Sequence, residues 1–191
     1  MSLALIVLAR QPSPGRCKRR LAASIGDQSA ARVQQRLLAH TVAVARQWQQ
    51  AQAGAVVRLC LGHHQGSGGL GLRMQRQLGR AVRAGATAAV LVGSDLPGLS
   101  VRQIQQAFSA LHHAPLVLGP ACDGGYWLVG LTAAGQRQQR GRLFSGIGWG
   151  GSEVLQQTLQ QAAALQWSPQ LLRYQSDLDR IDDMAPWHGA A

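Results

Sequence analysis

Acidic residues are scarce in the middle of this chain. Between Asp27 and Glu153 there are two, Asp95 and Asp123, and each follows an apolar run that breaks into a turn containing glycine or proline. The only lysine, Lys18, lies in a third segment of this kind. Carboxylates suit a divalent metal and an ammonium suits phosphate, so these residues predict a site for a metal and a phosphate group.

The segment around Lys18 reads ARQPSPGRCKRRL. Its backbone N–H groups, with Arg10, Lys18 and Arg20, are donors of the kind that hold a diphosphate. The glycine spacings of the Walker loop and of the dinucleotide-binding turn are absent. An ordinary basic surface loop, turned by Pro-Ser-Pro-Gly, fits the same residues.

Asp95, in GSDLPGL, comes directly after the apolar run Ala88 to Val92. A carboxylate at the end of a buried parallel strand can bind Mg²⁺ or Mn²⁺ that bridges phosphate oxygens. The same carboxylate can instead accept turn N–H groups or cap the next helix. In the segment DGGY, the two glycines after Asp123 permit either a left-handed turn or a close approach of the backbone to a ligand.

Late in the chain, Asp177 and Asp179 form a D-x-D pair that can offer two oxygens to one cation. Two further acids at positions 182 and 183 make a solvated helix start an equally good interpretation. Trp149, in the glycine-rich FSGIGWGGSEVL, is either a packed aromatic or a platform for a ring. The histidine pairs and the three cysteines lack metal-ligand spacing, and no G-x-S-x-G elbow indicates a hydrolase.

The apolar periodicity predicts strands that alternate with helices. Strands are expected at 3–9, 55–61, 88–92, 115–118, 126–131 and near 171–174, and helices at 27–52, 70–82, 100–111 and near 152–164, with a short closing helix. This order predicts a three-layer α/β/α fold around a mainly parallel mixed sheet. Ligands of such folds bind at the carboxyl ends of the strands.

The composition limits the class of protein. A chain of 191 residues with 46% hydrophobic and 14% charged residues is expected to form a single domain over 1–191. No run is long enough for a membrane span and no signal peptide is recognisable, so we expect a cytoplasmic protein with no membrane partner. The net charge of +11 is spread along the chain, which favours a basic surface over a nucleic-acid site. The sequence gives no indication of the oligomeric state.

Six segments together resemble a bacterial family of small GT-A-type glycosyltransferase-like proteins, related in fold to molybdopterin-guanylyltransferase-like and phospholactate-guanylyltransferase-like nucleotidyltransferases. The resemblance spans nearly the whole chain. Its segments, in order, are ARQPSPGRCKRRL, GLGLRM, GSDLPGL, GPACDGGYWLVGL, IGWGGSEVLQQT and DLDRIDDM. The chain departs from the family pattern at Arg19, where threonine is usual, at Leu72, where an acid is common, and at Gly150-Gly151, which replace a Ser/Thr pair.

The resemblance implies a nucleotide-diphospho-sugar transferase (GT-A) fold with a divalent metal, Mg²⁺ or Mn²⁺. It places the metal on Asp95 and Asp179. It places the sugar or acceptor pocket at Gly124, Gly125, Tyr126 and Trp149, with Asp123 and Lys18 in catalytic roles. The implied nucleotide and phosphate contacts are Ala9, Arg10, Pro14, Gly15, Lys18, Arg20 and Ser94.

Three functions follow as hypotheses. The first is transfer of a sugar from a nucleoside diphosphate sugar to a small acceptor. The second is nucleotidyl transfer, in which a phosphorylated acceptor attacks a nucleoside triphosphate and pyrophosphate leaves. The third, motivated by the departures at Arg19, Leu72 and Gly150, is a nucleotide-binding protein without catalysis.

Overall fold

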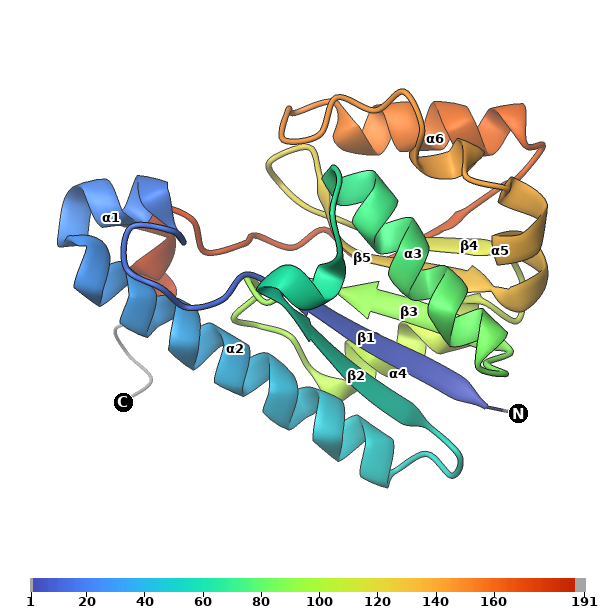
Figure 1. The fold of residues 1–191 in the computed structure, drawn as a ribbon, viewed down its shortest axis with the longest axis horizontal. Helices are drawn as coiled ribbons and strands as arrows, with labels where there is room; N and C mark the ends of the chain where they lie inside the picture. The colour runs from blue at the N-terminus through green and yellow to red at the C-terminus, as the bar shows by residue number, and fades with distance from the viewer. Residues whose placement is uncertain (1, 188–191) are drawn as a thin grey trace.

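Six strands form one mixed sheet in the computed structural model, which describes residues 2–187 (Figure 1). The strand order is β2-β1-β3-β5-β4-β6, and only β5 runs antiparallel to its neighbours. The strands are β1 (Leu3–Ala9), β2 (Val56–Leu61), β3 (Ala88–Val92), β4 (Leu116–Pro120), β5 (Tyr126–Thr132) and β6 (Gln170–Leu171). The predicted α/β fold class is therefore confirmed.

Helices cover both faces of the sheet, as the alternation of elements predicts. On one face, α2 (Asp27–Gln50) and α4 (Val101–Ala110) pack on β1, β3 and β5. On the other face lie α3 (Leu70–Arg83) and α6 (Val154–Ala164). Ser100 is the N-cap of α4, and its hydroxyl accepts the Gln103 N–H in a capping box. The central strands β1 and β3 are continuous apolar runs because both of their faces are buried.

Two short helices occupy segments for which the sequence predicts no helix. The first is α1 (Arg19–Ile25), and the second is α5 (Ala133–Gln139), whose N-cap Thr132 accepts the Gly135 N–H at 3.0 Å. Seven residues are too few for a helix that is stable alone, so tertiary packing decides both. For α1 that packing centres on Leu21, which is fully buried in a cluster with Ala30, Leu37 and Leu178.

The segment after β6 crosses from the sheet to α1, as the red trace in Figure 1 shows. Gln175 pairs with Ala121 beside β4, and the Leu178 N–H donates to the Asp95 carbonyl at 2.9 Å. Leu178 then packs beneath α1, and a 3₁₀ helix, η3 (Asp182–Trp187), follows. This path brings the late acids of the chain to the loop that follows β1.

A four-residue 3₁₀ helix, η1 (Gly62–Gln65), lies between β2 and α3, and a three-residue one, η2 (Arg142–Phe144), lies between α5 and α6. Over residues 2–187, no helix combines the length and the apolar character that crossing a membrane requires.

Gly130, in the middle of β5, has no space for a side chain. A Cβ there would lie 2.7 Å from Val117 Cγ1 and 2.9 Å from Val90 Cγ2. We expect Gly130→Ala to lower the free energy of unfolding by about 1–3 kcal/mol, because extra atoms in a filled core force its neighbours apart. Urea unfolding measures this, with Gly98→Ala as the control, since Gly98 is exposed in a turn and a Cβ there meets only the end of the Gln175 side chain, at 3.9 Å. Equal stability of the two variants would contradict the packing argument.

Candidate functional site

The side chain of Lys18 is buried and joins three segments of the chain. Its ammonium lies 2.7 Å from Asp95 Oδ1 and also donates to the Leu178 carbonyl. Lys18 is 5% exposed, whereas the Asp95 side chain is 49% exposed. The backbone of Lys18 is left-handed, with φ 47° and ψ 46°, a conformation that non-glycine residues adopt at a cost. The ion pair thus fixes the loop after β1 against the end of β3.

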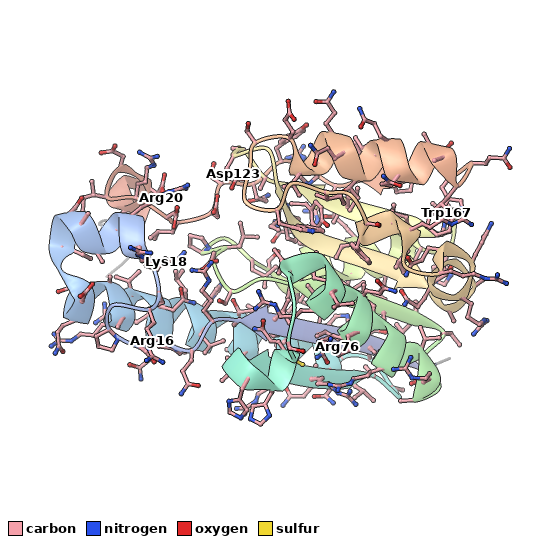
Figure 2. All side chains as sticks on the ribbon, turned by 45° about the horizontal axis from the view of Figure 1, so that its top comes forward. Arg16, Lys18, Arg20, Arg76, Asp123 and Trp167 are labelled. Atoms are coloured by element: carbon pink, nitrogen blue, oxygen red, sulfur yellow. The ribbon has the colours of Figure 1, made fainter. Side chains whose placement is uncertain are left out.

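Arg20 and Asp179 face each other on the outer side of α1. Arg20 Nη1 donates to Asp179 Oδ2 at 2.9 Å, and the two side chains are 62% and 32% exposed. In Figure 2, Lys18 and Arg20 lie beside α1, and Asp123 lies at the end of the sheet that faces them. Arg20, expected to bind phosphate, and Asp179, expected to bind metal, therefore form an ion pair with each other. Asp177, and not Asp179, lines a cavity at this end of the sheet.

Two adjoining cavities of about 280 and 320 Å³ lie at the carboxyl ends of β1 and β3. Their common wall contains one guanidinium and one carboxylate, together with apolar and aromatic side chains: Arg10, Leu70, Met74, Gly93, Asp95, Tyr126 and Trp127. A ligand that fills both cavities would pass directly by Arg10 and Asp95.

The first cavity is lined by Ala9 and Ser94, for which the sequence resemblance implies nucleotide and phosphate contacts, and also by Gln65 and Arg73, which were not among the implied site residues. Gln65 is buried, and its Nε2 donates to the Ala9 and Cys60 carbonyls at 2.7 and 3.2 Å. Its Oε1 accepts Arg73 Nη1 at 3.1 Å, so the amide orientation is fixed. The only sequence signal for Arg73 is its place in the segment GLGLRM. Gln65 carries none.

Ser94 is buried, and its hydroxyl accepts the Gln34 amide at 2.8 Å. This bond anchors the turn before Asp95 to α2.

The second cavity is shaped by close approaches of glycine to other groups. Gly124 has φ +89°, and a Cβ on it would lie 1.8 Å from the Ser152 carbonyl oxygen. The Gly124 carbonyl in turn accepts the Leu155 N–H at 2.9 Å, so the Asp123 turn packs beneath the start of α6. The Asp123 side chain is exposed, and its Oδ1 accepts the Gly125 N–H at 2.9 Å.

Trp149 forms a wall of this second cavity. A Cβ on Gly71 would lie 2.6 Å from Trp149 Cζ2, so the indole rests directly on the backbone of α3. The Tyr126 ring meets Trp149 edge-on, with ring centres 6.3 Å apart. These contacts make Trp149 a packed aromatic, and it also lines the second cavity.

The pKa of the Asp177 carboxyl is raised above its ordinary value of 3.8, first by burial and then by the nearby charges of Asp123 and Asp95, while Lys18 lowers it. Burial also raises the pKa of the Tyr126 hydroxyl, which keeps it protonated. Asp177 thus lies close enough to Asp123 and Asp95 for their charges to act on it.

The loop between β1 and α1 carries a separate basic surface. A more open hollow of about 550 Å³ is lined by three arginines and a histidine but by no acid: Arg10, Gln11, Ser13, Arg16, Gly62, His63, Gln65 and Arg73. Pro14 and Gly15 are exposed in this loop. Within residues 2–187, no group of three or more histidine, cysteine or acidic side chains has the arrangement of a metal site.

Comparison with known proteins gives a family and a fold. A family model described as "Uncharacterized protein conserved in bacteria (DUF2064)" matches residues 24–151. No curated protein matches the sequence. Among solved structures, a "putative nucleotide-diphospho-sugar transferase" from Desulfovibrio desulfuricans G20 is 26% identical, with a TM-score of 0.85 over 96% of this chain and 85% of that one.

Two further structures share the fold at lower identity. Rv0371c from Mycobacterium tuberculosis H37Rv, crystallised with manganese, is 16% identical over the full length of both chains, with a TM-score of 0.52. A CMP:2-keto-3-deoxy-manno-octonic acid synthetase complexed with CTP is 7% identical, with a TM-score of 0.56 over 99% of this chain and 98% of that one. The predicted nucleotide-diphospho-sugar transferase fold is therefore confirmed.

Replacing Lys18 tests the buried ion pair. We expect Lys18→Met to lower the free energy of unfolding by about 1–3 kcal/mol, because it leaves the Leu178 carbonyl without its donor and the half-exposed Asp95 without its cation. Arg20→Met, which breaks the exposed pair with Asp179, should cost less than about 1 kcal/mol. Chemical denaturation measures the free energy of unfolding of both variants. A larger decrease for Arg20→Met than for Lys18→Met would refute the conclusion that the Lys18–Asp95 pair is the more stabilising one.

Asp177→Asn tests the raised pKa. Burial and neighbouring acids penalise the charged carboxylate in the fold, so the contribution of Asp177 to stability falls as the pH rises above 3.8. We expect Asp177→Asn to stabilise the protein at pH 7 and to lose this advantage at pH 3, where the acid is protonated in both states. Thermal melts across this range, with exposed Asp182→Asn as the control, measure it. An advantage independent of pH would exclude ionisation as its cause.

Proposed function

This chain belongs to the bacterial family DUF2064, and from its likeness to the "putative nucleotide-diphospho-sugar transferase" structure and from the two adjoining cavities we propose that it is a transferase that moves a sugar from a nucleoside diphosphate sugar to a small acceptor. The observation that carries the proposal is the wall between the cavities, which combines Arg10 with Asp95. The nucleoside would occupy the first cavity, the diphosphate would pass Arg10 and Asp95, and the sugar and acceptor would meet in the second.

The first cavity suits a nucleoside because apolar side chains flank fixed polar groups. Leu8, Leu70 and Met74 provide apolar surface, and Gln65 and Arg73 hold each other in one orientation. Ligand sites of this size commonly combine apolar walls with a few oriented polar groups. The basic hollow beside it adds Arg16 and His63, which would favour an anionic ligand.

The residues present fit a divalent cation. Asp95 is half-exposed, lines both cavities and gives one oxygen to Lys18, and Asp177 lines the second cavity. Mg²⁺ and Mn²⁺ sites in transferases use one or two carboxylates and complete their shell with substrate phosphates and water, so no third protein ligand is required. When bound, the cation would supply positive charge to the departing diphosphate. Rv0371c, which shares the fold, was crystallised with manganese.

Arg10, Lys18 and Asp123 would have different roles in the transfer reaction. The bond between the sugar carbon and the diphosphate oxygen breaks, a bond to the acceptor oxygen forms, and the nucleoside diphosphate leaves. Arg10 would balance the charge of the leaving group, and Lys18 would hold Asp95 in place. Asp123, exposed at the second cavity with one oxygen bonded to Gly125, would take the acceptor proton.

Nucleotidyl transfer is the second candidate, because the fold is shared with a synthetase complexed with CTP. Release of pyrophosphate rather than a nucleoside diphosphate would identify it.

A protein without catalysis is the third candidate, and two of the three departures that motivated it lie on the surface. Arg19 and Leu72 are exposed and do not line the two cavities, whereas Gly150 lines the second.

Nucleotide binding with and without Mn²⁺ tests the site. We expect Asp95→Asn and Asp177→Asn each to weaken Mn²⁺-dependent binding of a nucleoside diphosphate sugar by about tenfold or more, because each removes a charged ligand. Asp179→Asn should bind as the unmodified protein does, since Asp179 pairs with Arg20. Titration calorimetry against UDP-, GDP-, CDP- and dTDP-sugars gives the affinities, and circular dichroism checks the fold. Loss of binding in Asp179→Asn alone would overturn this choice of ligands.

A further inference from the structure

The second cavity is acidic although the protein is strongly basic. Three of the eight acidic residues of the chain, Asp95, Asp123 and Asp177, line it, and among residues 2–187 Arg10 is its only basic lining residue. We propose that the acceptor is an uncharged or cationic alcohol or amine with an apolar ring face, and that phosphorylated and carboxylated molecules are excluded. This inference rests on the proposed function and names the substrate class of the same site.

Within the described part of the chain, an anionic acceptor in the second cavity would find no positively charged side chain that is free to pair with it. Lys18 already offsets Asp95 through the ion pair at 2.7 Å. The charge of the divalent cation would be offset by the donor diphosphate that it binds, so the negative charge of Asp123 and Asp177 remains against Arg10. Arg10 also lines the first cavity, where the donor diphosphate would share it. Arg20 is paired with Asp179. Exposed arginines elsewhere are screened beyond about 8 Å at physiological salt, so the net charge of +11 does not reverse the local sign.

The uncharged part of the lining suits a ring. Tyr126, Trp127 and Trp149 contribute aromatic surface, and Leu96 and Val154 contribute aliphatic surface. Trp149 is fixed between the backbone of Gly71 and the edge of Tyr126. Fixed aromatic walls bury apolar surface at little entropic cost, which favours an acceptor with a flat apolar face.

The proton chemistry agrees with a neutral hydroxyl or an amine. Transfer requires that the acceptor lose one proton as its oxygen or nitrogen bonds to the sugar carbon. Asp123 is the exposed carboxylate at this cavity, and its Oδ1 is held by the Gly125 N–H at 2.9 Å. An O–H or N–H group donates naturally to such a carboxylate, whereas a phosphate or carboxylate would meet it with like charge.

Cys122 lies directly beside the cavity lining, so the reactivity of its thiol reports the electrostatic potential next to the cavity. It is exposed between two lining residues, Ala121 and Asp123, whereas Cys17 and Cys60 are buried. Its rates of modification by a cationic trimethylammonium-ethyl and an anionic sulfonatoethyl methanethiosulfonate would be compared with the rates for a free thiol. We expect a normalised preference for the cation of at least about fivefold, since a cation is attracted and an anion repelled by the same charges.

Variants identify the source of the preference. Asp123→Asn and Asp177→Asn should each reduce it at least twofold, whereas Glu153→Gln, which removes an exposed acid outside the cavity lining, should leave it unchanged. Equal rates for the two reagents, a preference for the anion, or no response to either Asp variant would overturn the proposal.

The modification rates of Cys122 are also measured in the presence of Mn²⁺ and UDP or GDP. This experiment distinguishes a failure of the inferred acceptor class from a failure of the proposed function. If the nucleotide binds and the cation preference persists, both stand. If the nucleotide binds and the preference reverses, the acceptor class is wrong while the nucleotide site stands. If no nucleotide binds, the proposed function fails, and the rates in the free protein still decide whether the cavity excludes anions.

Discussion

The buried ammonium of Lys18 is the constraint on which the site depends. A charge that is almost fully removed from water must be paired and hydrogen-bonded, and Asp95 and the Leu178 carbonyl meet that need. Three segments far apart in the sequence are thereby joined: the loop after β1, the exit of β3 and the chain after β6. The left-handed backbone of Lys18 is held in place by the same contacts. The position of Asp95, and with it the wall between the cavities, follows from this pairing.

The two ends of the site carry opposite charge. The hollow beside the first cavity is lined by arginines and a histidine, and the second cavity is lined by three carboxylates. Such a concentration of carboxylates is electrostatically unfavourable, and burial together with the charges of Asp123 and Asp95 raises the pKa of Asp177. An anionic donor entering from the basic side and an acceptor held on the acidic side would use this arrangement.

Close backbone contacts give the second cavity its shape. Gly124 lies against the Ser152 carbonyl, and Gly71 lies against the Trp149 indole, at distances that exclude any Cβ. These glycines explain in physical terms why the segments DGGY and GLGLRM occur with the fold. The exposed Leu72 beside Gly71 takes no part in this packing, so its departure from the family pattern leaves the cavity unchanged.

The sequence by itself determined the strands, the layers of helices and the placement of Asp95 and Asp123 at strand ends, because apolar runs and turn-forming residues are local signals. Only the tertiary structure decided which charges meet. The D-x-D spacing does not reveal that Asp177 lines the cavity while Asp179 binds Arg20, since burial of the intervening Leu178 beneath α1 fixes that segment. Likewise, α1 exists because Leu21 is buried, and Gln65 reaches the site through hydrogen bonds to distant carbonyls. Pairings of this kind depend on long-range packing, which no local pattern records.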